Sequence, residues 1–152
     1  MFRVTRAEEQ AVRLTMRLAV LARQATLAEL AECEDLPEPM VAKLLGMLRR
    51  EGVVEAVRGR NGGYVLAGHP TEISAAQVIA AVASDAAFGY PCRDTGDQPD
   101  CPRTDNCGLR PVWQHLERRV NEVLRQTSIA DLLKRESTAD QDLYELWPRE
   151  RS

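Results

Sequence analysis

The sequence has no long hydrophobic run, no apolar leader and few aromatic residues, and each absence argues against a class of protein. No run of eighteen apolar residues occurs among the 152 residues, so no membrane-spanning segment is predicted. Glu8 and Glu9 lie where a signal peptide would need apolar residues, which predicts a cytoplasmic protein. Aromatic residues make up 5% of the chain, which argues against a β-sandwich and against a platform that stacks bases.

Histidine is also scarce, and this argues against an enzyme. A catalytic cysteine needs a neighbouring base, which histidine commonly supplies. The two histidines, His69 and His115, lie outside the segment that holds three of the four cysteines. We therefore expect no catalytic residue and no small-molecule substrate.

The charge of the chain is small but unevenly distributed. The formal net charge is −3, which by itself does not indicate nucleic-acid binding. Residues 43–60 nevertheless hold five basic side chains against two acidic ones, whereas residues 71–152 hold ten basic and fourteen acidic ones. A basic segment in an acidic chain indicates either a phosphate-binding surface or an ordinary solvated surface, and the surrounding pattern must decide.

The spacing of apolar residues predicts three helices in the first fifty residues. Thr5 and Glu8 stand three apart, as in a capping box, and begin a helix over residues 6–24. Thr26 caps a second helix, in which Cys33 is expected to be a small buried hydrophobe. The third begins near Pro39 and ends at Gly52. The expected buried positions are Ala11, Leu14, Leu18 and Leu21 in the first helix, Leu27, Leu30 and Ala31 in the second, and Val41, Leu44, Leu45 and Leu48 in the third.

A hairpin is predicted directly after the third helix. Two short β-prone runs, 53–58 and 63–66, are joined by the turn signal Gly59-Arg60-Asn61-Gly62. Three helices followed by a hairpin predict a winged helix-turn-helix domain over residues 1–70. The fold class is therefore mainly α with a small β wing. Such a domain places its third helix in the major groove of double-stranded DNA.

The basic residues fall where this domain would contact DNA. The face of the third helix opposite its apolar stripe carries Met40, Lys43, Met47 and Arg50. Glycines at the hairpin turn permit close approach to phosphates, and arginines there can enter a minor groove. The expected DNA contacts are Met40, Lys43, Arg50, Arg58, Arg60, Asn61 and Gly62.

Residues 71–108 combine a short helix over 75–83, capped by Ser74, with a segment that shows no periodicity. This segment holds Cys92, Cys101 and Cys107, and three thiolates around a soft metal centre can order it. Zinc loops usually space their ligands two to four residues apart, whereas gaps of eight and five residues suit an iron–sulfur cluster better. Structural zinc and a metal-free thiol switch remain open, and a disulfide is disfavoured in the cytoplasm.

A long amphipathic helix is predicted over residues 109–126, and a shorter one over 129–134 follows Ser128. A small N-terminal domain cannot bury the whole apolar stripe of the long helix. We therefore expect residues 109–136 to form a homodimer, which also doubles the DNA-binding element. Packing against the first helix is the alternative. Residues 137–152 are expected to form a polar tail. The apolar stripe comprises Val112, Leu116, Val120, Val123 and Leu124.

The run LLGMLRREGVVEAVRGRNGGYVL, from Leu44 to Leu66, resembles the helix and wing of the iron–sulfur regulator family that includes IscR, NsrR and RirA. The three-cysteine segment and the long helix extend the resemblance over residues 1–135. The resemblance implies a dimeric winged-helix repressor with an iron–sulfur cluster held by three cysteines and one other ligand. It also implies that DNA affinity follows the state of the cluster, in response to nitric oxide, redox stress or the supply of iron and clusters.

Two departures from this family concern the ligands. The first gap between cysteines is longer than is usual in the family, and Arg110 stands where IscR-like members have a histidine. NsrR-like members instead use a carboxylate early in the first helix of the partner subunit, and that position aligns with Glu9. A capping box would occupy Glu8, so Glu9 is the expected fourth ligand, with Glu8 and His115 as alternatives. This ligand set favours a 4Fe–4S cluster over a 2Fe–2S cluster.

Overall fold

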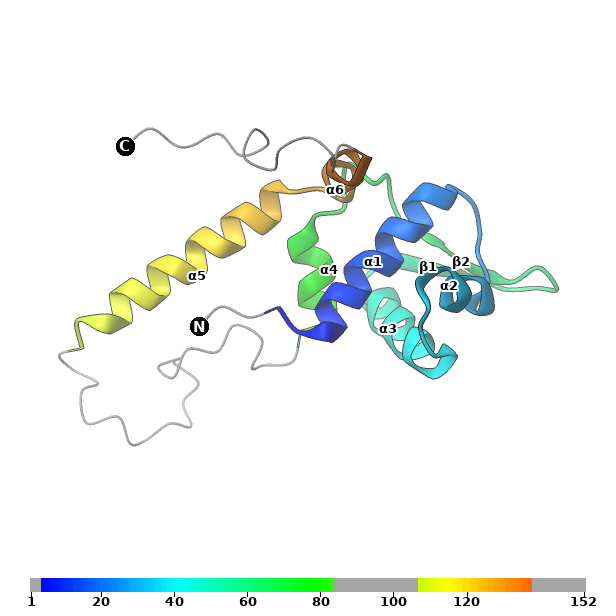
Figure 1. The fold of residues 1–152 in the computed structure, drawn as a ribbon, viewed down its shortest axis with the longest axis horizontal. Helices are drawn as coiled ribbons and strands as arrows, with labels where there is room; N and C mark the ends of the chain where they lie inside the picture. The colour runs from blue at the N-terminus through cyan, green and yellow to red at the C-terminus, as the bar shows by residue number, and fades with distance from the viewer. Residues whose placement is uncertain (1–3, 84–106, 138–152) are drawn as a thin grey trace.

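The computed structural model describes residues 4–83 and 107–137 of the chain, and Figure 1 shows how they are arranged. The described part is mainly helical, with one two-stranded antiparallel sheet, as predicted. The elements are α1 (Arg6–Leu21), α2 (Leu27–Glu34), α3 (Glu38–Arg50), β1 (Val54–Val57), β2 (Gly63–Leu66), α4 (Ala75–Val82), α5 (Leu109–Gln126) and α6 (Ile129–Ser137).

The start of α1 has the predicted capping box. The Thr5 N–H donates to Glu8 Oε2 at 2.6 Å, and the Glu8 N–H donates to Thr5 Oγ1 at 3.3 Å. These two bonds satisfy backbone donors that an α-helix leaves without partners at its start. The helix ends three residues earlier than expected, because Ala22 adopts a left-handed conformation with φ of 50° and its N–H bonds to the Leu18 carbonyl.

Three other predicted caps are confirmed. Thr26 Oγ1 accepts from the Glu29 N–H at 3.1 Å at the start of α2. Ser74 begins α4 in the same way, with Gln77 as the donor. Ser128 Oγ accepts from the Asp131 N–H at 3.0 Å and begins α6, which extends three residues beyond its expected end. The two bonds that Ser128 donates to the Asp131 carboxylate hold the pKa of this group below its usual value.

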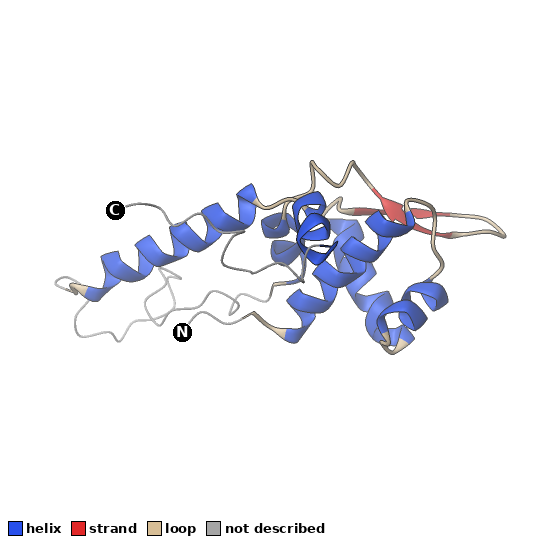
Figure 2. Cartoon of the chain, turned by 45° about the horizontal axis from the view of Figure 1, so that its top comes forward, coloured by secondary structure: helices blue, strands red, loops and turns tan. Residues whose placement is uncertain are grey.

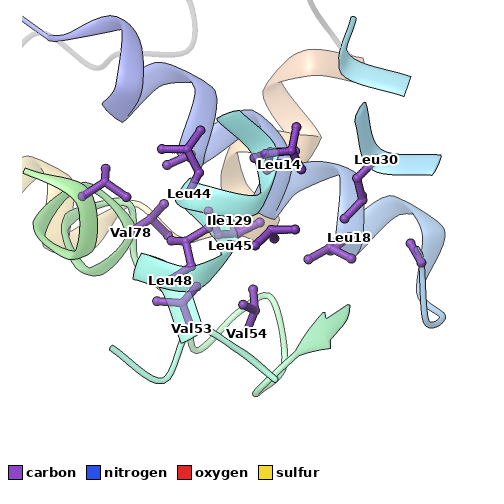
Figure 3. Packing of buried hydrophobic residues seen from close by; sticks show 14 of the residues in the cluster. Leu14, Leu18, Leu30, Leu44, Leu45, Leu48, Val53, Val54, Val78 and Ile129 are labelled. Atoms are coloured by element: carbon purple, nitrogen blue, oxygen red, sulfur yellow. The ribbon is translucent and has the colours of Figure 1, made fainter. Parts of the chain in front are cut away.

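The core lies where α1, α3 and α4 meet, and it includes the first residue of α6 (Figure 3). Leu14 of α1, Leu45 of α3 and Ile129 of α6 are fully buried. The backbone holds this junction together, since the Ile129 N–H bonds to the Ile73 carbonyl and the Ala75 N–H bonds to that of Thr127. The chain therefore returns from α5 into the same core that supports the first three helices.

Helix α5 projects away from this core in both views (Figures 1 and 2). None of its residues is buried, although Val112, Leu116 and Val123 lie on its apolar stripe. Leu116 is 48% exposed and Val112 is 51% exposed. The described part of the chain thus leaves this stripe largely uncovered, and packing on α1 does not bury it. Among the helices within 4–83 and 107–137, none is long and apolar enough to cross a membrane.

Candidate functional site

Helix α3 presents opposite faces to the core and to solvent. Val41, Leu44, Leu45 and Leu48 are buried, as predicted. Met40, Lys43 and Arg50 are exposed on the other side. Met47 was expected on this outer face, but it is half-buried and packs against the core. The prediction for Met47 is therefore wrong, because the core extends further around α3 than the apolar stripe alone indicates.

The hairpin forms a wing with a cationic tip. Strands β1 and β2 pair antiparallel from Val54–Leu66 to Val57–Gly63. The turn closes with a 2.9 Å bond from the Gly62 N–H to the Gly59 carbonyl, and the φ of Gly59 is 125°, a value that side chains disfavour. Arg58, Arg60 and Asn61 are exposed at the tip, and Gly62 is half-buried. In Figure 2 the tip projects at the opposite end of the molecule from α5.

The base of the wing is held by the segment between α1 and α2. Ala25 and Tyr64 of β2 exchange two backbone hydrogen bonds of 2.8 and 3.0 Å, which form an isolated antiparallel bridge beside the two-stranded sheet. This segment passes so close to Gly63 that a Cβ there would lie 2.4 Å from the Ala25 carbonyl oxygen. Only glycine fits this position without a backbone shift.

A buried carboxylate joins the helix-turn-helix to α1. Glu34 is the last residue of α2, and its side chain is only 5% exposed. Arg13 Nε donates to Glu34 Oε2 at 3.0 Å, and Arg17 Nε donates to Oε1 at 2.7 Å. The hydrogen bond to Glu34 raises the pKa of Arg17. Removing one partner from such a buried group is costly, so these bonds fix the turn before α3 relative to α1.

Local sequence patterns do not predict this arginine–glutamate cluster. Glu34 lies 21 residues after Arg13 and 17 residues after Arg17 in the sequence. Charged residues on amphipathic helices also usually face solvent. Arg13 and Arg17 stand four residues apart and so share one face of α1. This spacing is the one sequence feature that points to a shared acidic partner.

The two candidate carboxylates in the first turn of α1 differ in environment. Glu8 is buried, and one of its oxygens caps the helix while Oε1 has no hydrogen-bond partner. The Glu9 side chain is 56% exposed and forms a 3.6 Å ion pair with Arg13. An exposed pair of this kind contributes little to stability, so Glu9 can exchange its partner at low cost.

The cysteines are only partly covered by the structure. Cys107 is half-buried and lies two residues before α5, whereas Cys92 and Cys101 lie outside the described residues. Cys33 is exposed on α2, so its prediction as a buried residue is wrong. Within 4–83 and 107–137, no group of three His, Cys, Asp or Glu side chains could hold a metal ion.

The starts of α1 and α5 lie well apart in a single chain, as both views show (Figures 1 and 2). These two helix starts carry Glu9 and adjoin Cys107, respectively. The alternative ligand His115 is exposed on α5. Within one chain, the helix start that carries Glu9 and the helix start that adjoins Cys107 are therefore separate.

Helices α1–α3 and the β1–β2 wing form a winged helix-turn-helix fold, which is typical of DNA-binding regulators. The chain matches the Rrf2 family, described as an iron-dependent transcriptional regulator, over residues 4–135. The chain belongs to this family, whose members are regulators and not enzymes.

Individual relatives agree with this assignment. A Neisseria meningitidis protein named as an HTH-type transcriptional regulator is 30% identical over 114 residues, which cover 75% of this chain and 74% of the relative. The structure of IscR from T. potens aligns with a TM-score of 0.70 at 26% identity, covering 95% of this chain and 96% of that chain. The structure of CymR, the global cysteine regulator of B. subtilis, aligns with a TM-score of 0.69 at 25% identity, covering 87% and 96%. The chain is accordingly a DNA-binding regulator related to IscR and CymR.

The fit of Gly63 against Ala25 gives a testable prediction about the wing. We expect Gly63→Ala to force the wing away from Ala25 and to break one or both backbone bonds, lowering the free energy of unfolding by about 1–3 kcal/mol. Gly68→Ala is the matched control, because its Cβ would meet only the Glu72 carboxylate at 3.5 Å, an ordinary contact. Urea unfolding measures both variants. Equal midpoints for the two would contradict the proposed role of Gly63.

Proposed function

We propose that α3 and the wing tip form the DNA-contacting surface of this regulator. The observation that supports this most directly is the orientation of α3, whose core-facing stripe leaves Met40, Lys43 and Arg50 exposed. At the wing tip, Arg58, Arg60 and Asn61 are exposed on a turn whose other residues are glycines. The helix would lie in a major groove, and the half-buried Gly62 would let the wing backbone approach a phosphate.

Two substitutions test this surface. Lys43→Ala and Arg60→Ala should each weaken binding to the duplex that the wild-type protein selects from a randomised library. Each lost phosphate contact should also reduce the slope of log affinity against log salt by about one unit. Arg118→Ala, which removes an exposed cation from α5, is the control and should leave both quantities unchanged. If neither Lys43→Ala nor Arg60→Ala alters binding, the DNA-contacting surface lies elsewhere.

We further propose that the protein is a homodimer joined through α5. Exposed apolar side chains repeat along one face of this helix at positions 109, 112, 116 and 123. An apolar face of this length is unusual on a monomer and typical of a subunit interface. Two antiparallel copies of the helix would cover each other and set the distance between two DNA-binding domains.

The dimer prediction can be tested at the middle of α5. Leu116→Arg places a charge on the apolar face and should shift the protein from dimer to monomer in sedimentation analysis. Operator affinity should fall with it, because one half-site contact is lost per complex. Gln114→Arg adds the same charge two residues away, on another face of the helix, and should remain dimeric. A dimeric Leu116→Arg protein would exclude this interface.

We propose that DNA affinity is controlled by an iron–sulfur cluster held by Cys92, Cys101 and Cys107 of one subunit and Glu9 of the other. The donor set is consistent with such a group, since Glu9 is exposed and engaged only in a weak ion pair. The separation of the starts of α1 and α5 favours a ligand set drawn from two chains. When bound, the group would supply a centre that reacts with nitric oxide or oxygen or is lost when iron is scarce.

The residues of the chain then have distinct roles in this proposal. The cysteines preceding α5 would bind the iron through thiolates, and Glu9 would add a harder oxygen ligand that is released more readily. Arg13 would hold Glu9 whenever that carboxylate is not engaged, because the two side chains already form an ion pair. Release of Glu9 would free α1 of one subunit from its partner and change the separation of the two recognition helices, making the protein a cluster-dependent repressor.

Metal analysis and substitution of Glu9 test the cluster. Protein purified without oxygen should be brown, with about four irons and four sulfides per chain. Glu9→Ala should lower cluster content or abolish the response of DNA binding to nitric oxide, and Glu32→Ala, an exposed acid on α2, should do neither. Two irons and two sulfides would indicate the smaller cluster. Zinc without sulfide, or no metal, would overturn the proposal in favour of a zinc-stabilised or thiol-based regulator.

A further inference from the structure

Gly46 is an exposed glycine in the middle of α3, and nothing in the described part of the chain requires it. Glycine is the poorest helix former after proline, because it loses the most backbone freedom on folding. A Cβ built on Gly46 meets no atom within 4 Å, so no neighbouring element needs the space. Its backbone is ordinary right-handed helix, so a left-handed conformation does not explain it either.

Four other glycines of the same domain do have a reason within the chain. Gly52 and Gly59 have positive φ values of 72° and 125°. Gly62 and Gly63 lie so close to backbone oxygens that a Cβ would clash with them. The helix therefore loses stability at Gly46 without an intramolecular gain, which indicates that the missing side chain matters for an intermolecular contact.

The position of Gly46 on α3 identifies the partner surface. Gly46 follows Lys43 by three residues and precedes Arg50 by four, and residues at these spacings share one face of a helix. Both cations are exposed, and Ala42, four residues before Gly46, is an exposed small residue on the same side. Gly46 therefore lies between two cationic side chains of the proposed DNA-contacting surface, and DNA is the expected partner in the intermolecular contact.

The dimensions of helix and groove explain why a missing side chain matters there. An α-helix with its side chains is about 10–12 Å across, and the major groove of B-DNA is about 12 Å wide. Any side chain on the groove-facing side limits how deeply the helix can enter. We propose that Gly46 is the point of closest approach between α3 and the DNA duplex, and that it lets α3 enter the groove deeply enough for neighbouring side chains to reach base edges while Lys43 contacts a phosphate. This inference rests on the proposed DNA-contacting surface.

A substitution series at Gly46 in the full-length protein tests this role. Gly46→Ala should raise the melting temperature by about 2–4 °C, since alanine is the better helix former. Its affinity for the selected duplex should nevertheless fall by about tenfold, the cost of one disturbed base contact. Gly46→Leu should fold equally well and lose affinity further, by about a hundredfold. A variant that is more stable but binds less well cannot be explained by damage to the fold.

The control adds the same bulk to another exposed helix position. Ala80→Leu on α4 should leave the affinity for the selected duplex unchanged. If Gly46→Ala and Gly46→Leu bind the selected duplex as tightly as the wild type, Gly46 is not a close-approach point, although α3 can still be the DNA-binding helix. If the Lys43→Ala and Arg60→Ala variants also bind normally, the proposed DNA surface itself is wrong and this inference falls with it.

Discussion

The burial of one face of α3 is the constraint on which the proposed DNA surface depends. Val41, Leu44, Leu45 and Leu48 are almost completely inaccessible and fix the rotation of the helix about its own axis. A helix has a period of 3.6 residues, so fixing one face also fixes the residues on the other. The packing of the core, rather than any contact that they make themselves, therefore keeps Lys43, Gly46 and Arg50 on the exposed face. Losing that packing would remove the surface together with the fold.

Much of the fold follows from local sequence signals, and the exceptions have identifiable causes. Capping residues and apolar spacing predicted every helix and the hairpin in the described part, because these signals act within a few residues. The early end of α1 at Ala22 was missed because an alanine in a left-handed conformation gives no sequence signal. Cys33 was misplaced because α2 has only eight residues, too few for apolar spacing to define its buried face.

The parts of the candidate site were predictable to different extents, because local sequence signals account for only some of them. The outer face of α3 follows from its inner face, and the exposed tip follows from the turn signal. Glu34 could not be predicted, because its burial depends on Arg13 and Arg17 from another helix. Gly46 was visible in the sequence, but its significance became clear only once the space around it was known. The periodicity of apolar residues does not predict contacts between segments that are distant in the sequence.

The arrangement of the chain also limits how a signal could reach the DNA surface. The start of α5, which Cys107 precedes by two residues, and the tip of the wing lie toward opposite ends of the molecule, with the core between them (Figure 1). The core side chains are close-packed, and Glu34 holds α2 to α1 with both of its oxygens, so a rearrangement inside one chain would disrupt many contacts. Helix α5 has no buried residue, so a change in its orientation would disrupt fewer contacts. In the proposed dimer, the motion of lowest cost would therefore be that of one DNA-binding domain relative to the other. A regulator built in this way would change the spacing of its recognition helices rather than their structure.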